Sequence, residues 1–179
     1  LESFMTIEYF SLIWPLVLII MVVSFGASAL AGEVDDKTIE VLLAQPISRV
    51  KIFLGKYFSG VALILVYVFA TIFSVVPLAA VYSVDYDLAS YVNVAVVGGL
   101  FGFAIFSMTM LISSTLSSRG TAAGISAGIT LVMYIMFLLS SMQESLENLK
   151  YLSFFHYFDY REAMIEQVGK VALTSRAFR

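Results

Sequence analysis

Four long stretches of this chain contain no charged residue, and they limit its possible folds more than any other feature. They cover residues 9–32, 57–84, 88–118 and 120–143. A helix needs about 20 apolar residues to cross a hydrocarbon layer roughly 30 Å thick. None of the stretches shows the strict apolar–polar alternation of a barrel strand. We therefore expect an all-α fold, a polytopic transmembrane helix bundle. The predicted spans are residues 9–32, 57–83, 91–116 and 121–142.

Composition agrees with a membrane protein and excludes several other classes. Hydrophobic residues make up 60% of the chain and charged residues 13%, whereas about 25% of the residues in a soluble domain are charged. The net charge of −3 and the lack of a basic stripe argue against a nucleic-acid partner. There is no cysteine, which excludes disulfides and thiolate metal sites. Leu1 is followed by acidic Glu2 and Glu8, so we expect the sequence to begin inside a longer protein.

The placement of lysine and arginine predicts the orientation of the spans. Four basic residues lie between the first two spans, and Arg119 lies between the third and fourth, but the second connection carries only Asp85 and Asp87. By the positive-inside rule, the loops 33–56 and 117–120 are cytoplasmic in a multi-pass protein of the cell membrane. Residues 144–169 are then expected outside, as an aromatic and partly helical segment. We treat residues 1–169 as one membrane domain and leave the tail 170–179 unassigned.

The loop 33–56 is more than a turn. Thr38 or Asp36 can cap a short helix that has Glu40 in its first turn, and the apolar residues Ile39, Leu42 and Leu43 give that helix one apolar face. Pro46 should end it. Ser48 can cap a second helix, which begins near Arg49 and continues into the next span. The loop should therefore hold an amphipathic helix along the membrane surface, followed by a sharp bend.

These residues resemble a known family. The order Glu33, Thr38-x-Glu40-x-Leu42-Leu43, Pro46-x-Ser48-Arg49 and Gly55-Lys56 is similar to the first cytoplasmic loop of type-2 ABC transporter permeases. The turn at 117–120 and the aromatic stretch 152–158 also resemble that family, from its second to its fifth span. One departure is Lys37, where the family often has glycine.

The resemblance implies a function for the loop. Its helix would be the coupling helix, which docks on a cytoplasmic ATPase subunit that binds Mg-ATP, while this chain binds no cofactor. The chain would pair with a second permease subunit, identical or different, and would be part of an exporter. Without the resemblance, the same loop could be an interfacial amphipathic helix of a membrane scaffold.

Glycines recur at helical spacing in the last two stretches. Gly98 and Gly102 form one pair, and Gly120, Gly124 and Gly128 recur every four residues. Such rows let helix backbones approach closely. The close approach could lie within one subunit or at a seam between two subunits.

Two other functional classes fit the sequence less well. Gly124-Ile-Ser126-Ala-Gly128 matches the nucleophile motif of serine hydrolases, which would suggest an intramembrane protease, but the sole histidine, His156, is expected outside the membrane. A channel would usually carry ionisable residues within its spans, and these have none. No metal-ligand cluster and no phosphate-binding loop is present, so ATP would have to be hydrolysed by a partner. The sequence does not indicate the cargo.

Overall fold

In the part of the chain that the structure describes, four long apolar helices form the bundle. The computed structural model describes residues 13–44, 46–82, 88–142 and 151–157. The first long helix is continuous through α2 (Trp14–Ala27), the π-helical turn η2 (Ser28–Gly32) and α3 (Glu33–Asp35). The others are α5 (Arg49–Tyr82), α6 (Leu88–Thr115) and α7 (Arg119–Met142), with the short helices α4 (Ile39–Leu43) and α8 (Phe154–Tyr157). The described residues contain no strand, and the predicted all-α class is confirmed.

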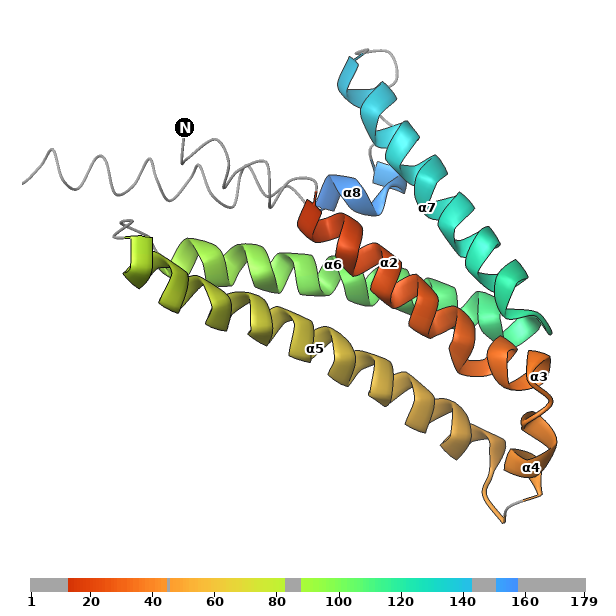
Figure 1. Cartoon of the computed structure of the whole chain (residues 1–179). Coiled ribbons are helices and arrows are strands. Elements are labelled where there is room, and N and C mark those ends of the chain that lie inside the picture. Colours follow the sequence, from red (N-terminus) through yellow and green to blue (C-terminus); the bar gives the residue numbers. More distant parts are fainter. Residues whose placement is uncertain (1–12, 45, 83–87, 143–150, 158–179) are drawn as a thin grey trace, which may run out of the picture.

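Helix α6 lies at the centre of the arrangement. It packs against α2, α5 and α7, and α8 contacts both α6 and α7 (Figure 1). Each of the four long helices is apolar and long enough to cross a membrane. Both connections predicted to share one side, α3 to α5 and α6 to α7, lie at the same end of the bundle.

Large apolar side chains of α2 and α6 fill the core. The most deeply buried are Trp14, Leu18, Ile105, Phe106 and Met110. Polar groups inside the bundle bond across helices, because hydrocarbon offers them no other partner. The Trp14 Nε1–H donates to the Thr71 hydroxyl at 2.9 Å, and the Tyr57 and Ser107 hydroxyls lie 2.8 Å apart.

The helices run past the predicted spans. Helix α5 begins at Arg49 rather than at residue 57, α6 at Leu88 rather than 91, and α7 at Arg119 rather than 121. For α5 and α7 the prediction excluded charged residues from the span, but a helix can continue beyond the hydrocarbon layer as long as its backbone hydrogen bonds are made. The three additional residues of α6 are uncharged. Residues 9–12 of the first span, the tail 170–179 and most of the predicted segment 144–169 lie outside the described residues.

Candidate functional site

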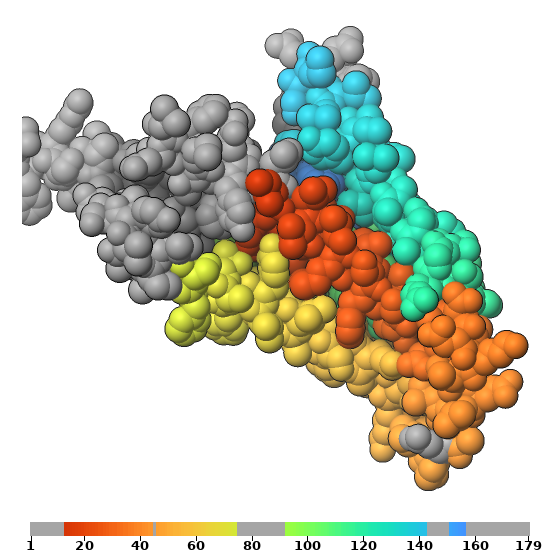
Figure 2. Space-filling model, in the orientation of Figure 1, coloured from red at the N-terminus to blue at the C-terminus, as the bar shows by residue number. Residues whose placement is uncertain are grey.

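The loop 33–56 protrudes from one end of the bundle (Figures 1 and 2). Helix α3 ends in a tight turn, in which the Asp36 N–H donates to the Gly32 carbonyl at 2.9 Å and the Lys37 N–H to the Val34 carbonyl at 3.1 Å. Lys37 has a φ of 57°, in the left-handed region that suits a residue without Cβ. This geometry accounts for the glycine that resembling permeases often have there.

Substitutions at Lys37 should therefore act through the backbone. Lys37→Val is expected to be less stable than Lys37→Gly by about 1–2 kcal/mol, since a β-branched residue is penalised at positive φ. Asp36→Val is the control, because Asp36 has an ordinary φ of −80°. Thermal unfolding of the purified chain in detergent measures the difference. Equal midpoints for the valine and glycine variants at 37 would mean that the turn is not left-handed in solution.

Glu33 organises the start of the loop. Its carboxylate forms an ion pair with the Lys56 ammonium group on α5. The Thr38 hydroxyl lies within hydrogen-bond distance of the same carboxylate and 3.2 Å from the Glu33 carbonyl. Thr38 stands at the cap position of α4 but makes no side-chain cap bond to that helix. The prediction that the Thr38 side chain caps α4 is thus wrong, because its hydroxyl bonds to the Glu33 carboxylate instead. The pairing of Glu33 with Lys56 was not predicted from the sequence.

Helix α4 divides its apolar side chains between two environments. Ile39 and Leu42 are half-buried, whereas Leu43 is 43% exposed and Val41, on the opposite side, is 70% exposed. Glu40 is exposed. The predicted apolar face is therefore partly covered by the chain itself, and Val41 adds an apolar contact point that the prediction missed.

The bend after α4 leads directly into α5. Pro46 is exposed and lies between the two helices, so α4 ends before it. As predicted, Ser48 caps α5: its hydroxyl accepts from the Lys51 N–H at 3.4 Å, and its carbonyl accepts from the Ile52 N–H at 3.2 Å. Arg49, the first residue of α5, is exposed. The neighbouring side chains of Ile47 and Val50 are 43% and 65% exposed.

The short connection between α6 and α7 is hydrogen-bonded to the loop 33–56. The Asp35 carboxylate accepts from the backbone N–H of Arg119 at 3.2 Å. Arg119 is the first residue of α7, where unpaired N–H groups and the helix dipole favour a carboxylate. Neither the pairing nor the closeness of residues 35 and 119 was predicted from the sequence.

The predicted glycine rows differ in their surroundings. Gly98 is buried, and a Cβ at Gly102 would lie 2.9 Å from Leu18, so α2 and α6 approach closely there. By contrast, a Cβ at Gly124 or Gly128 would meet no described atom within 4 Å, and at Gly120 only the Ser118 hydroxyl at 3.9 Å. The row on α7 is not buried against the described part of this chain.

The serine of the hydrolase motif has no base beside it in the described residues. Ser126 is fully buried, and its hydroxyl has no hydrogen-bond partner there. His156 lies in α8, with its ring 5.3 Å from that of Tyr151. No group of three or more candidate metal ligands occurs among the residues that the structure describes.

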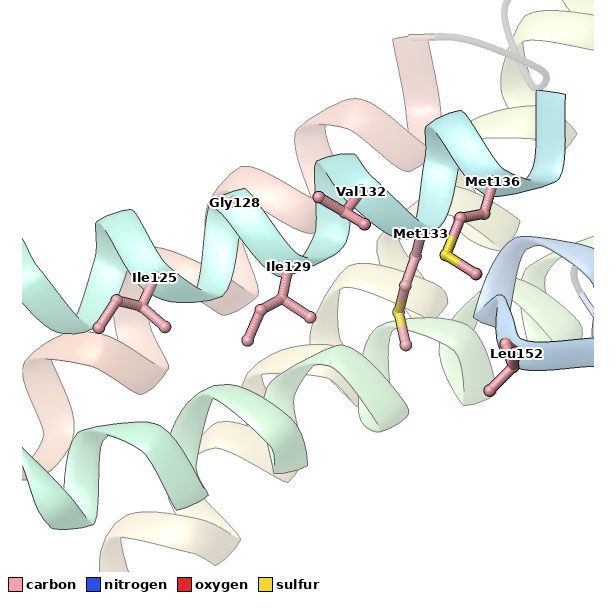
Figure 3. A pocket seen from close by; sticks show the side chains of 7 residues that line it. All are labelled: Ile125, Gly128, Ile129, Val132, Met133, Met136 and Leu152. Atoms are coloured by element: carbon pink, nitrogen blue, oxygen red, sulfur yellow. The ribbon is translucent and has the colours of Figure 1, made fainter. Parts of the chain in front are cut away.

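A shallow apolar groove runs along α7. Figure 3 shows that successive turns of this helix line it together with Leu152. Its lining residues are Ile125, Gly128, Ile129, Val132, Met133, Met136 and Leu152. A specific ligand site usually combines apolar walls with a few polar groups that orient the ligand. This groove offers no polar side chain, and we assign no substrate to it.

Comparison with known proteins identifies the family. The chain matches the family model described as ABC-2 family transporter protein over residues 3–178. No curated protein and no solved structure matches it. The family match covers nearly the whole chain, the helices supply four membrane-spanning elements, and the loop carries the residues by which the sequence resembled type-2 permeases. This chain therefore belongs to the ABC-2 transporter family and is a multi-pass membrane component of an ABC transporter.

Proposed function

We propose that this chain is the permease subunit of an ABC exporter and that a separate ATPase subunit drives it through the loop 33–56. The observation that supports this most strongly is how the loop is attached. Its ends continue into the first long helix and α5, while Glu33 pairs with Lys56 and Asp35 with the start of α7. A force applied to α4 would therefore reach three of the four long helices.

The attachments orient the loop more than they stabilise the bundle. The side chains of Lys56 and Glu33 are 33% and 21% exposed, and ion pairs exposed in this way contribute about 0–1 kcal/mol. Contacts this weak can be exchanged when a partner moves the loop.

The outer surface of the loop can accept a protein partner. Val41, Leu43, Ile47 and Val50 are all exposed apolar side chains on or beside α4. Because Val41 and Leu43 lie on opposite sides of this helix, a partner would have to enclose it in a groove. Exposing such an apolar surface to water costs free energy. In most protein interfaces, a few apolar side chains surrounded by polar residues supply most of the binding free energy. Exposed Glu40 and Arg49 are the polar neighbours that would orient the partner. An interfacial helix facing lipid headgroups is the competing explanation.

The remaining subunits follow from the family. The sequence has no phosphate-binding loop, so Mg-ATP would be bound by the partner ATPase. A second permease subunit would complete the pathway. Export, rather than import, is the direction implied by the resemblance to type-2 permeases.

Purification of the full, tagged chain from its native membrane tests the proposal. We expect an ATPase with a Walker A sequence to co-purify, identified by mass spectrometry, and the preparation to hydrolyse ATP. Preparations of the folded chain without such a subunit, and without ATP hydrolysis, would favour the scaffold alternative.

Orientation gives a separate prediction. Cysteines introduced singly at Ser48, which is exposed, and at Asp85, in the connection expected outside, should react with an impermeant maleimide from opposite sides, because basic loops stay cytoplasmic. In intact cells only the residue 85 variant should be labelled, and Ser48 should be labelled only after permeabilisation. Labelling of position 48 in intact cells would reverse the topology.

A substitution in the exposed glycine row on α7 tests whether this row packs against a second subunit. Gly124→Leu should leave the monomer folded, because the described chain has no atom within 4 Å of a Cβ there. If the row packs against a second subunit, the variant should lose dimers in a cross-linking assay. Gly102→Leu is the contrasting variant, since its side chain would collide with Leu18 inside the subunit. Undiminished dimers in Gly124→Leu would place this face against lipid.

A further inference from the structure

The first long helix is interrupted directly before the loop by a side chain from α6. The Ser113 hydroxyl accepts from the Ala31 N–H at 3.0 Å and donates to the Ala27 carbonyl at 3.0 Å. In an α-helix these two backbone groups would bond to each other. Ser113 is 1% exposed, and its hydroxyl thus replaces one backbone hydrogen bond of the neighbouring helix.

Burial along the helix shows what the insertion does. Buried pairs of residues are four positions apart from Val22–Val23 to Gly26–Ala27, but the next pair, Ala31–Gly32, follows after five, with Ala29 also buried between them. An α-helix returns to the same face after three or four residues. Residues Ser28–Gly32 are wound as a π-helix, which accommodates one extra residue, and such turns often mark functional positions.

We propose that Ser113 is a releasable pin that holds the end of the first long helix in π winding, and that the loop moves when this winding changes to α. This proposal rests on the proposed coupling function. In the released state the Ala31 N–H would bond directly to the Ala27 carbonyl. The loop would then turn by about 100° around the helix axis and shift by about 1.5 Å, the values for one residue of α-helix.

Both windings can satisfy every group involved, which is the condition for a switch. Serine and threonine on helices commonly bond the carbonyl four residues earlier. On α6, Thr109 does so to Ile105 at 2.9 Å and Ser107 to Phe103 at 2.8 Å. A released Ser113 has the same option toward the carbonyl of Thr109. The contacts that oppose release are the packing of Ala31 against Ala122 and the pairs of Glu33 with Lys56 and of Asp35 with Arg119. The two pairs lie where a partner on the loop could break them.

Loss of the hydroxyl should by itself drive the change. With Ser113→Ala, π winding would leave the Ala31 N–H buried without a partner, whereas the Ala27 carbonyl can still accept from the N–H five residues later. One buried N–H without a partner costs more than an exposed loop contact contributes. Nitroxide labels on cysteines at Asp36 and Thr115, both exposed, report the result as a distance measured by EPR. We expect a shift of several ångströms in Ser113→Ala and none in Ser114→Ala, whose hydroxyl donates to the Leu111 carbonyl of its own helix. An unchanged distance in Ser113→Ala would overturn the proposal.

Removal of the extra residue provides a second test. Deletion of Ser28 should give α winding with the loop in its original direction. The distance between the two nitroxide labels should therefore match the distance in the unmodified chain. Adding Ser113→Ala to this deletion should then change neither the distance nor the yield. If Ser113→Ala alone does not fold, its rescue by the deletion supports the pin, and failure of both variants refutes it.

A measurement on the complex with the ATPase tests whether the change from π to α winding takes part in coupling. Mg-ATP with vanadate should shift the label distance in the complex of the unmodified chain, but not in the complex of the Ser28 deletion, which has no extra residue to release. Equal shifts in both complexes would overturn the switch. If no ATPase co-purifies, the proposed function fails, while the measurements on the chain alone still decide whether Ser113 is a pin.

Discussion

Replacing Val41 and Leu43 together by alanine is expected to weaken ATPase binding by about 30-fold or more. The two side chains are 70% and 43% exposed on α4. Truncating a central apolar anchor commonly costs about 2 kcal/mol, and each 1.4 kcal/mol is a factor of ten in affinity. ATP hydrolysis linked to transport should be lost with the complex. The bundle itself should stay folded, because neither side chain belongs to its core.

The measurement is co-purification of the ATPase with the tagged variant, together with thermal unfolding of the variant alone. Leu131→Ala is the matched control: Leu131 is 57% exposed on α7, away from the loop. Leu42→Ala tests the inward side, and since Leu42 is half-buried, its loss should loosen the loop before it affects the partner. An undiminished complex in the double variant would show that the loop contacts lipid headgroups instead.

The sequence was sufficient to predict the helices because one physical constraint dominates. Apolar length predicted four spans, and the Ser48 cap and the break at Pro46 are visible as local residue choices. Helix ends were less well predicted. Helix α5 extends back to Arg49, and the presence of charged residues says where hydrocarbon ends rather than where a helix ends.

Contacts between distant residues could not be predicted. The Glu33–Lys56 pair, the Asp35 carboxylate at the start of α7 and the Ser113 hydroxyl inside another helix each join residues at least 23 positions apart. Nothing in local pattern distinguishes Ser113 from Ser114, which bonds its own helix. All residues from Gly26 to Gly32 except Leu30 are small, so the residue pattern does not reveal the extra residue of the π-helical turn.

The second large effect is expected at Gly60, where α5 meets the aromatic core. A Cβ there would overlap the ring of Phe106, which is 1% exposed and lies against Tyr57 with ring centroids 5.5 Å apart. The ring has no free space to enter, because close-packed interiors contain few voids. Gly60→Ala should destabilise the bundle by about 2 kcal/mol, within the usual range for overpacking.

Gly55 supplies the control on the same helix. A Cβ at Gly55 would meet nothing within 4 Å, so Gly55→Ala should gain helix propensity and stabilise by up to about 1 kcal/mol. Unfolding of both variants in mixed detergent, followed by circular dichroism, measures the contrast. Phe106→Leu should recover part of the loss when combined with Gly60→Ala, because a smaller side chain relieves the overlap, although alone it should destabilise. Equal stability of the two glycine variants would mean that α5 and α6 do not approach each other at Gly60. A movement of the loop would then not reach the core through this contact of α5.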